Sequence, residues 1–352
     1  MHFHCRNVNE AFERIVSAVH HEAVSVVRSP SRNGDVLKIE EPVIVTYSHP
    51  CERVLFNMRR DANPFFHLFE SLWMLSGSNL VEPLAFYNSN ISRYSDDSKT
   101  FHGDYGWRWR SNHDRLRRIA EALQKNPNCR RQVLAIWSAK HDLGATSADI
   151  PCNTQAYFSM RKEEITTTAN KVFRTHKSVL DMTVCNRSND LVWGMLGANV
   201  VHFSFLLEYM AALIGVGVGR YHQITNNLYT CIDKWEPNYW LDSPKQEYNP
   251  TWKHQPLVSN PYVFDMECIQ FVKSIDGEFT EPFLRDVAQP MCAAYRAHKQ
   301  RRYYGDNNAM RILEKVHATD WKEAGMAWVE KRQRKWEAKS RQKQDKPEQA
   351  NG

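Results

Sequence analysis

The sequence lacks the short motifs that usually mark metal sites, disulfide frameworks and phosphate-binding loops. Its eight cysteines are scattered at positions 5, 51, 129, 152, 185, 231, 268 and 292, with no Cys-x-x-Cys pair. The fifteen histidines show no metal-ligand spacing, and neither a glycine-rich phosphate loop nor a Ser–His–Asp arrangement is recognisable. We therefore assign no residue to a metal, and scattered thiols in a chain of this length are typical of a reducing compartment.

A secretory leader is not recognisable either, because residues 1–15 lack a basic segment followed by an apolar run. The most apolar window, residues 200–219, contains His202 and Glu208 and ends in glycines, so it predicts a buried helix and not a membrane span. The net charge of +6 suits an anionic small molecule but is too small to indicate nucleic-acid binding. We expect a cytoplasmic protein with no membrane partner.

Hydrophobic periodicity predicts an α+β fold around one sheet. Apolar residues at helical spacing mark the helices, and alternating apolar residues mark the strands. The predicted helices cover residues 9–28, 63–75 and 203–214, and the predicted strands cover 131–138, 156–160, 180–185 and 219–228. Residues 29–34 and 81–112 are expected to be loops, the second of them functional, and residues 163–177 a hairpin.

The pattern becomes helical after about residue 280. We expect a main domain at residues 1–280, a helical extension at 281–340 and a polar, basic, disordered tail at 341–352. Trp328 and Trp336 lie among basic residues, a pattern found in segments that bind nucleic acid. We favour the alternative, an amphipathic helix that packs its tryptophans on the main domain.

Cys152 is the candidate nucleophile. It follows Pro151 at the start of an alternating segment, in the sequence DIPCNT, so its sulfur is expected at the end of a strand. A nearby arginine would stabilise the thiolate, which is the reactive form of cysteine. Taken alone, such a residue is more simply explained as a buried structural cysteine.

Several arginines near turns and strand ends are candidates for phosphate binding. Arg32 lies in a glycine-containing turn, Arg130 and Arg131 precede a predicted strand, and Arg187 ends one. The planar guanidinium group offers phosphate a bidentate contact that lysine does not match. Each arginine, taken singly, is more simply explained as solvated surface charge.

Glu70 and Asn199 stand out because of their surroundings. Glu70 lies among phenylalanines and leucines on a predicted helix, and burial raises the pKa of a carboxyl group toward the range of a proton shuttle. Asn199 follows a glycine-containing turn at a helix start, and its amide offers a donor and an acceptor to a pyrimidine edge. The structural alternatives are a polar helix stripe for Glu70 and an N-cap for Asn199.

Several segments occur in a characteristic order: FHLFESLWMLSG, DYGWRWR, CRRQVLAIW, IPCNT, and NRSND followed by GAN. This series, between about Arg32 and Asp233, resembles the motifs of the thymidylate synthase and pyrimidine hydroxymethylase family, in its phage-type form. The resemblance implies a thymidylate synthase-like α/β fold for residues 1–280, with a mixed central sheet flanked by helices. It also implies a homodimer with shared active sites and the cosubstrate 5,10-methylenetetrahydrofolate.

The resemblance implies a role for each matching residue. Cys152 is expected to add to C6 of the pyrimidine, so that C5 attacks the methylene carbon, while Glu70 manages protons at O4 and orders water. Asn199 is expected to read the base edge, and Asp190 to contact the folate. The remaining implied contacts are Tyr105 near the base, the phosphate ligands Arg32, Arg187 and Ser188, and the phosphate ligands Arg130 and Arg131 from the partner subunit.

Some positions depart from the family pattern. Ser92 replaces a tryptophan that keeps water from the reacting methylene in methyl-forming enzymes, so a hydroxymethyl product is favoured. The sugar-contacting segment begins at Asn227, and its Tyr229 and Cys231 replace histidine and tyrosine, which leaves deoxyribose and ribose both open. Helices also take the place of the short hydrophobic C-terminal tail that closes the site in synthases.

Asn153 replaces a common histidine, and one extra residue precedes Asn199. Asparagine at the base-reading position usually goes with uracil, which favours dUMP. We therefore expect hydroxymethylation of dUMP or dCMP, as a step of deoxynucleotide biosynthesis or of modified DNA synthesis. The alternatives are a thymidylate synthase, which makes dTMP and releases dihydrofolate, and a nucleic-acid-binding protein that uses its basic C-terminal helix.

Overall fold

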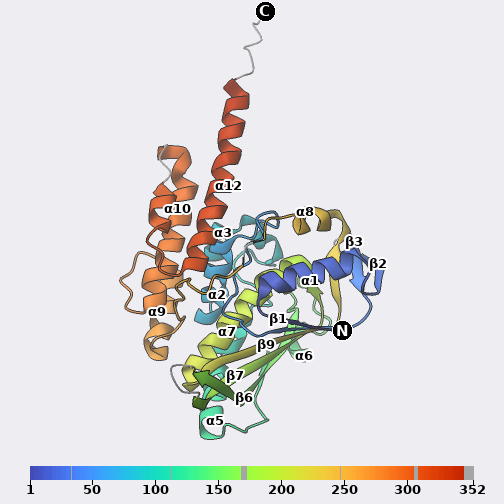
Figure 1. Ribbon diagram of the computed structural model, residues 1–352, viewed down its shortest axis with the longest axis vertical. Helices are drawn as coiled ribbons and strands as arrows, with labels where there is room; N and C mark the ends of the chain where they lie inside the picture. The colour runs from blue at the N-terminus through green and yellow to red at the C-terminus, as the bar shows by residue number, and fades with distance from the viewer. Residues whose placement is uncertain (33, 112, 168–172, 246, 305–307, 345–352) are drawn as a thin grey trace, which may run out of the picture.

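The computed structural model describes residues 1–352 apart from 33, 112, 168–172, 246, 305–307 and 345–352 (Figure 1). A mixed six-stranded sheet forms one side of the molecule, in the strand order β1-β4-β9-β7-β6-β5. Its long hairpin, β6 and β7, confirms the hairpin predicted at 163–177 as far as the described residues extend. The strands are β1 (His2–Cys5), β4 (Val43–Tyr47), β5 (Val133–Ala135), β6 (Asn153–Thr167), β7 (Phe173–Asn186) and β9 (Gly217–Thr225).

A second, four-stranded sheet has the order β2-β3-β10-β8. It corrects two predictions, because the helix expected at 9–28 ends at His20 and the loop expected at 29–34 lies in a β-hairpin. The β-branched residues Val26 and Val27 begin this hairpin, where strand pairing outweighs the weak helical pattern. The strands are β2 (Val26–Ser31), β3 (Gly34–Ile39), β8 (Asn189–Asp190) and β10 (Leu228–Cys231).

Helix α7 (Asn199–Ile214) is the central helix of the core and continues from a π-helical segment, η2 (Leu191–Ala198), with a kink at Gly197. The combined span Leu191–Ile214 is long and apolar enough to cross a membrane, by length and composition only. However, 83% of its most apolar window is buried inside the protein. The predicted buried helix is therefore confirmed, with its start four residues earlier than expected at 203.

Helix α2 (Pro64–Ser76) packs against α7 and confirms the helix predicted at 63–75. The Asn63 side chain accepts a hydrogen bond from the Phe66 amide at 3.2 Å, and Gly77 ends the helix in the left-handed conformation, with φ of 76°. The loop predicted at 81–112 contains short helices instead. The shorter helices are α1 (Val8–His20), α3 (Val81–Tyr87), η1 (Ser89–Tyr94), α4 (Tyr105–Arg110), α5 (Arg115–Lys125), α6 (Ala139–Asp142), η3 (Ile232–Lys234) and α8 (Pro237–Leu241).

The C-terminal helices pack on α2, and the far end of α12 projects beyond the body (Figure 1). Trp328 is buried with its ring 5.3 Å from that of Phe65, as the packing interpretation requires, whereas Trp336 is 51% exposed. Helix α12 includes residues 341–344, which were expected to be disordered, and the rest of the predicted tail lies outside the described residues. These helices are α9 (Pro261–Lys273), η4 (Leu284–Ala288), α10 (Gln289–Tyr304), α11 (Asn308–Leu313) and α12 (Thr319–Gln344).

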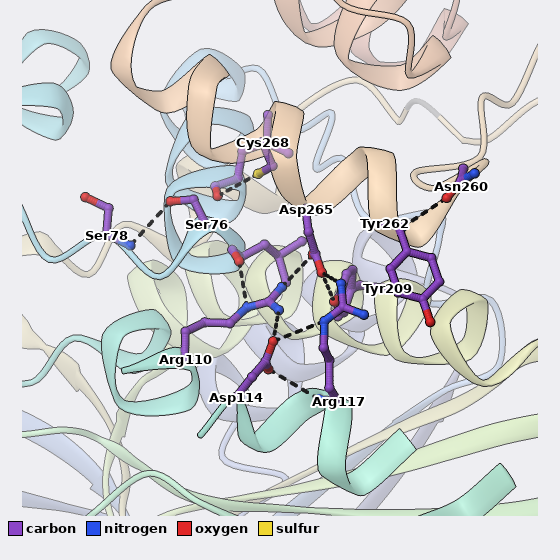
Figure 2. Close-up of polar contacts among 12 residues, drawn as sticks. Ser76, Ser78, Arg110, Asp114, Arg117, Tyr209, Asn260, Tyr262, Asp265 and Cys268 are labelled. Carbon is purple, nitrogen blue, oxygen red and sulfur yellow. Dashed lines mark hydrogen bonds and ion pairs between the residues drawn. The ribbon is translucent and has the colours of Figure 1, made fainter. Parts of the chain in front are cut away.

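A polar cluster fastens α9 to the helices around the central core, as Figure 2 shows. Asp265 of α9 accepts hydrogen bonds from Arg110 of α4 at 3.0 Å and from the Tyr209 hydroxyl of α7 at 3.1 Å. Arg117 of α5 pairs with the same carboxylate, and Asp114 accepts from Arg110 at 2.8 Å. Because both arginines are ion-paired, the cluster fixes the helices without leaving an unpaired charge.

Candidate active site

Cys152 lies directly before β6, beside the point where the neighbouring strand β7 ends. The residue after β7 is Arg187, whose backbone amide donates to the Cys152 carbonyl at 3.0 Å. The Arg187 guanidinium donates to the carbonyls of Ile150 and Pro151, both at 2.9 Å, and its Nη2 lies 3.9 Å from the Cys152 sulfur. The expected meeting of a cysteine and an arginine at a strand end is therefore present.

The pKa of the Cys152 thiol is nevertheless raised above its ordinary value. Burial has the largest effect and raises the pKa, while Arg187 and Arg32 lower it and the carboxylates of Asp149 and Asp190 raise it. The arginines thus act in the direction that the sequence predicted, but they do not outweigh burial. A further positive charge near the sulfur would be needed to make the thiolate abundant at neutral pH.

The candidate phosphate ligands fall into two groups. Arg32 lies at the turn between β2 and β3 and donates to the Ala148 carbonyl at 3.4 Å, which places it near the segment that leads to Cys152. Ser188 lies between β7 and β8, next to Arg187. Arg130 and Arg131 lie before the edge strand β5 and do not line the candidate cavities. Within one chain, the structure therefore brings Arg32 and Arg187 together but not the other pair.

A chain of side-chain amides connects Tyr105 to Asn199. Asn153 Nδ2 donates to the Tyr105 hydroxyl at 2.8 Å and to Asn199 Oδ1 at 3.2 Å, and Asn199 Nδ2 donates to Asn189 Oδ1 at 2.9 Å. Gly194 leaves room for the last bond, because a Cβ there would lie 2.2 Å from Asn189 Oδ1. The orientation of the Asn199 amide is fixed on both sides. The sequence analysis did not anticipate the parts that Asn153 and Asn189 play.

Two cavities contain about half of the predicted residues, but Cys152, Arg187 and Ser188 do not line either of them. The larger has a volume of about 930 Å³ and the smaller about 190 Å³, and Tyr94 of η1 lines both of them. Of the predicted residues, Arg32, Asp190, Tyr229 and Cys231 line the larger cavity, and Glu70, Tyr105 and Asn199 line the smaller one.

The predicted sugar-contacting segment forms β10 and the turn before it. Asn227 is in this turn, where its carbonyl accepts from the Asn189 amide at 3.0 Å. Tyr229 lies opposite Asp190 in the β8–β10 pair, and burial, followed by the charge of Asp190, raises the pKa of Tyr229 to about 12. Tyr229 and Cys231 therefore face the large cavity as neutral groups, whereas Asn227 has a backbone role.

Asp190 caps the helical segment η2. Its Oδ1 accepts from the amides of Val192 at 2.9 Å and Trp193 at 2.7 Å, and burial raises the pKa of its carboxyl group. Trp193, whose side chain is 49% exposed, has the Arg60 guanidinium 3.8 Å from its ring centroid and also lines the large cavity. This wall offers an acidic acceptor beside a flat aromatic surface.

Glu70 lies beside His202, which in the sequence is only a polar interruption of an apolar window. Glu70 Oε2 lies 2.9 Å from Nε2 of His202, which is one turn after Asn199 on α7. Both side chains line the smaller cavity. The interval of three residues from Asn199, which places two side chains on one face of a helix, was the available signal.

Cys51, Glu208 and His254 have ligand atoms within 4.8 Å of one another, the kind of group that holds a metal ion. Arg53, however, forms a buried ion pair with Glu208, and the Leu257 amide donates to the same carboxylate at 2.8 Å. Because this carboxylate is already neutralised, we assign no metal to the group.

A family model described as thymidylate synthase matches residues 62–236. Deoxyuridylate hydroxymethyltransferase of Pseudomonas phage M6 is 41% identical over 97% of this chain and 97% of its own length. The protein of the same name from Bacillus phage SP01 is 35% identical over 60% of this chain and 56% of its own length. The crystal structure of thymidylate synthase from T4 phage superposes with a TM-score of 0.52 over 74% of this chain and 90% of that one. At 17% sequence identity, the last likeness concerns the fold alone.

Proposed function

The chain belongs to the thymidylate synthase family, and we infer that it converts dUMP into 5-hydroxymethyl-dUMP by one-carbon transfer. The observation that carries this proposal is the 41% identity, over 97% of both chains, to a deoxyuridylate hydroxymethyltransferase. The match includes the C-terminal helices, which a thymidylate synthase that closes its site with a short tail would lack. A thymidylate synthase activity is therefore less favoured.

We assign the covalent step to Cys152. Its thiolate adds to C6 of the pyrimidine, which gives C5 the character of an enolate carbon, and it leaves from C6 at the end of the reaction. The guanidinium of Arg187, 3.9 Å away, stabilises the thiolate and holds the carbonyls of the preceding residues. The raised pKa of the thiol means that the free enzyme carries mainly the neutral form at pH 7.

We assign recognition of the base to Asn199. Asn153 already donates to its Oδ1, and Asn189 accepts from its Nδ2, so one acceptor position and one N–H are left for a ligand. Uracil offers N3–H and O4, which match such a pair, whereas cytosine offers an acceptor at N3 and a donor at C4. The amide chain thus supports dUMP as the substrate.

We assign the nucleotide phosphate to Arg32, Arg187 and Ser188, together with Arg130 and Arg131 from a partner subunit. The first group lies around the Cys152 segment, whereas the second lies at the edge of the sheet in the same chain. A homodimer would bring the second group to the phosphate. Its positive charges would also lower the pKa of Cys152 toward neutrality.

The large cavity is at the upper end of the usual size of ligand sites, so it has room for a second ligand beside the nucleotide. Asp190 and Trp193 on its wall fit the polar ring system of a folate. Bound there, 5,10-methylenetetrahydrofolate would supply the one-carbon unit at the oxidation level of formaldehyde. Transfer to C5 followed by addition of water needs no further reductant.

The choice of a hydroxymethyl product is supported by η1. Ser92 is in this short helix between Ile91 and Tyr94, both of which line the smaller cavity. A serine there fills less space than the tryptophan of methyl-forming enzymes and leaves room for water near C5. All eight cysteines are free thiols, which supports a reducing compartment such as the cytoplasm.

The proposal is tested by mass spectrometry of the product from dUMP, dCMP and CMP, each supplied with methylenetetrahydrofolate. We expect dUMP to gain CH2O, with no dihydrofolate in the absorbance record. A gain of CH2 together with dihydrofolate would establish the synthase instead. Turnover of dCMP in preference to dUMP would contradict the role given to Asn199.

A further inference from the structure

Glu70 and His202 form an unusual pair between two largely apolar helices, α2 and α7. Glu70 Oε2 and His202 Nε2 are 2.9 Å apart, and their side chains are 13% and 5% exposed. Neither atom makes a well-aligned hydrogen bond with any residue that the structure describes. Burying two ionisable groups with poor alignment is costly, so the pair is not explained by stability.

The pair also lines the cavity that holds the residues assigned to the base. His202 and Asn199 are on one face of α7, and both line the smaller cavity with Glu70 and Tyr105. The volume of about 190 Å³ exceeds that of one water several-fold, so water and the reactive edge of a base fit together. An acceptor for a proton of that water then lies in the same cavity as the residues assigned to the base.

We propose that His202 is the proton partner of Glu70 in the step that adds water to the nucleotide, and that this pairing commits the enzyme to a hydroxymethyl product. The inference rests on the proposed function. His202 acts through Glu70, as a positioning and proton-holding residue.

The step balances without an oxidant or reductant. The water oxygen bonds to the methylene carbon on C5, and the π electrons of that methylene move into the ring toward O4. The departing proton of water passes to the Glu70 carboxylate and is shared with the His202 imidazole. The ring electrons then restore the C5–C6 double bond and expel the Cys152 thiolate, and the proton leaves to solvent with the product.

Among the described residues that line the smaller cavity, His202 is the one histidine. For His67, one turn before Glu70 on α2, burial, followed by the charges of His202 and Arg60, lowers the pKa to about 3. It therefore stays neutral at working pH. Besides Tyr94, the other ionisable groups that line the cavity are Asp104, Tyr105 and Asp149, and burial raises the pKa of these three. The Glu70–His202 pair therefore shares the cavity with three groups, Asp104, Tyr105 and Asp149, whose raised pKa values keep them protonated to a higher pH than usual.

The test separates water addition from nucleotide activation. Exchange of the C5 hydrogen of dUMP for deuterium, followed by NMR without folate, reports on addition of Cys152 to C6 and proton exchange at C5, without the methylene and water steps. Formation of 5-hydroxymethyl-dUMP reports on the whole reaction. In His202→Gln we expect exchange within about twofold of wild type but product formation at least tenfold slower, as for loss of a proton acceptor. Intact-mass analysis under denaturing conditions should show a nucleotide adduct on Cys152 accumulating during turnover.

The matched control is His67→Gln, on the same pair of helices but outside the smaller cavity, which should leave the ratio of the two rates unchanged. Parallel loss of both rates in His202→Gln, or an unchanged product rate, would overturn the inference.

The wild-type enzyme gives a second test if the His202→Gln variant does not fold. The pH profile of product formation should then contain an ionisation that the exchange profile lacks, and identical profiles would reject the proposal. A wild-type enzyme that exchanges C5 hydrogen but makes only dTMP would instead refute the proposed function.

Discussion

The guanidinium of Arg187 lies 3.9 Å from the Cys152 sulfur while it also holds the carbonyls of Ile150 and Pro151. One side chain therefore both shapes the loop that presents the nucleophile and supplies its nearest positive charge. Burial still dominates and keeps the pKa of the thiol above its ordinary value. The reactivity of Cys152 should accordingly depend steeply on this arginine and on pH.

Arg187→Ala should slow the alkylation of Cys152 by iodoacetamide at pH 8, because removal of the charge raises the pKa of the thiol further. In wild type, the alkylation rate should rise with pH through and beyond the ordinary thiol pKa, since the thiolate reacts. The rates are measured by mass spectrometry of the labelled peptides. Cys129, whose pKa is lowered by its hydrogen bond with Gln132, is the internal reference. Equal Cys152 rates in wild type and Arg187→Ala would contradict the assigned contact.

Cys152→Ser should abolish product formation but weaken dUMP binding by no more than about 1–2 kcal/mol, because charge-assisted bonds to the phosphate supply most of the affinity. Calorimetric titration and the product assay measure the two effects. Cys185→Ser, in the neighbouring strand and on the opposite face from Asn186, is the control and should retain activity. Turnover by the Cys152→Ser variant at wild-type rates would exclude the covalent scheme.

Local signals in the sequence were sufficient for the parts of the fold that depend on neighbouring residues. The helix at 63–75 could be predicted because Asn63 and Pro64 begin it and its apolar residues repeat at helical spacing. The expected position of Cys152 at a strand end was also right, since β6 begins at the next residue. In both cases the determining contacts lie within a few residues.

Features that depend on distant contacts were missed. In the hairpin over residues 26–39, β2 pairs with β3, and β3 also pairs with β10. Strand β10 lies almost two hundred residues further along the chain, so no local pattern shows this pairing. His202 looked like an interruption in an apolar helix, because its partner Glu70 lies on a different helix. A positive charge beside Cys152 was expected to lower its pKa, but the opposing burial is a tertiary property.

Ser92→Trp should lower the yield of hydroxymethyl nucleotide, because an indole in η1 would fill space beside the smaller cavity and displace water. The product mixture from dUMP is quantified by mass spectrometry. Ser89→Trp, at the start of the same short helix, serves as the control for bulk. An unchanged rate and product in Ser92→Trp would show that the residue does not face the reacting carbon.

A shared active site predicts complementation between two inactive variants. In a heterodimer of Cys152→Ser and Arg131→Ala, one site would combine an intact cysteine with an intact partner arginine. Mixing and refolding equal amounts should therefore restore about a quarter of wild-type activity, if chains pair at random. Sedimentation analysis confirms the dimer in each preparation. Activity that stays at the level of the separate variants would place Arg131 in the same chain's site or outside it.

The ion pair between Arg53 and Glu208 should control stability and not chemistry, because Glu208 lies more than two turns after Asn199 on α7 and neither residue lines the two cavities of the site. Both side chains are buried, with 4% and 9% exposure. Burial raises the pKa of Glu208, but Arg53, His254 and the Leu257 amide together outweigh it, so the folded-state pKa is lowered. The stabilisation is therefore fully present above the unfolded-state pKa of about 4.3 and is lost as the pH falls through the lower folded-state pKa.

Glu208→Gln leaves the arginine buried without a counter-charge and should reduce the free energy of unfolding by about 3–5 kcal/mol at pH 7, measured by urea denaturation. The exposed pair of Glu330 and Arg334 offers the control, since Glu330→Gln removes a solvated charge and should change stability little. If both substitutions had the same small effect, the buried pair would not carry the stability assigned to it.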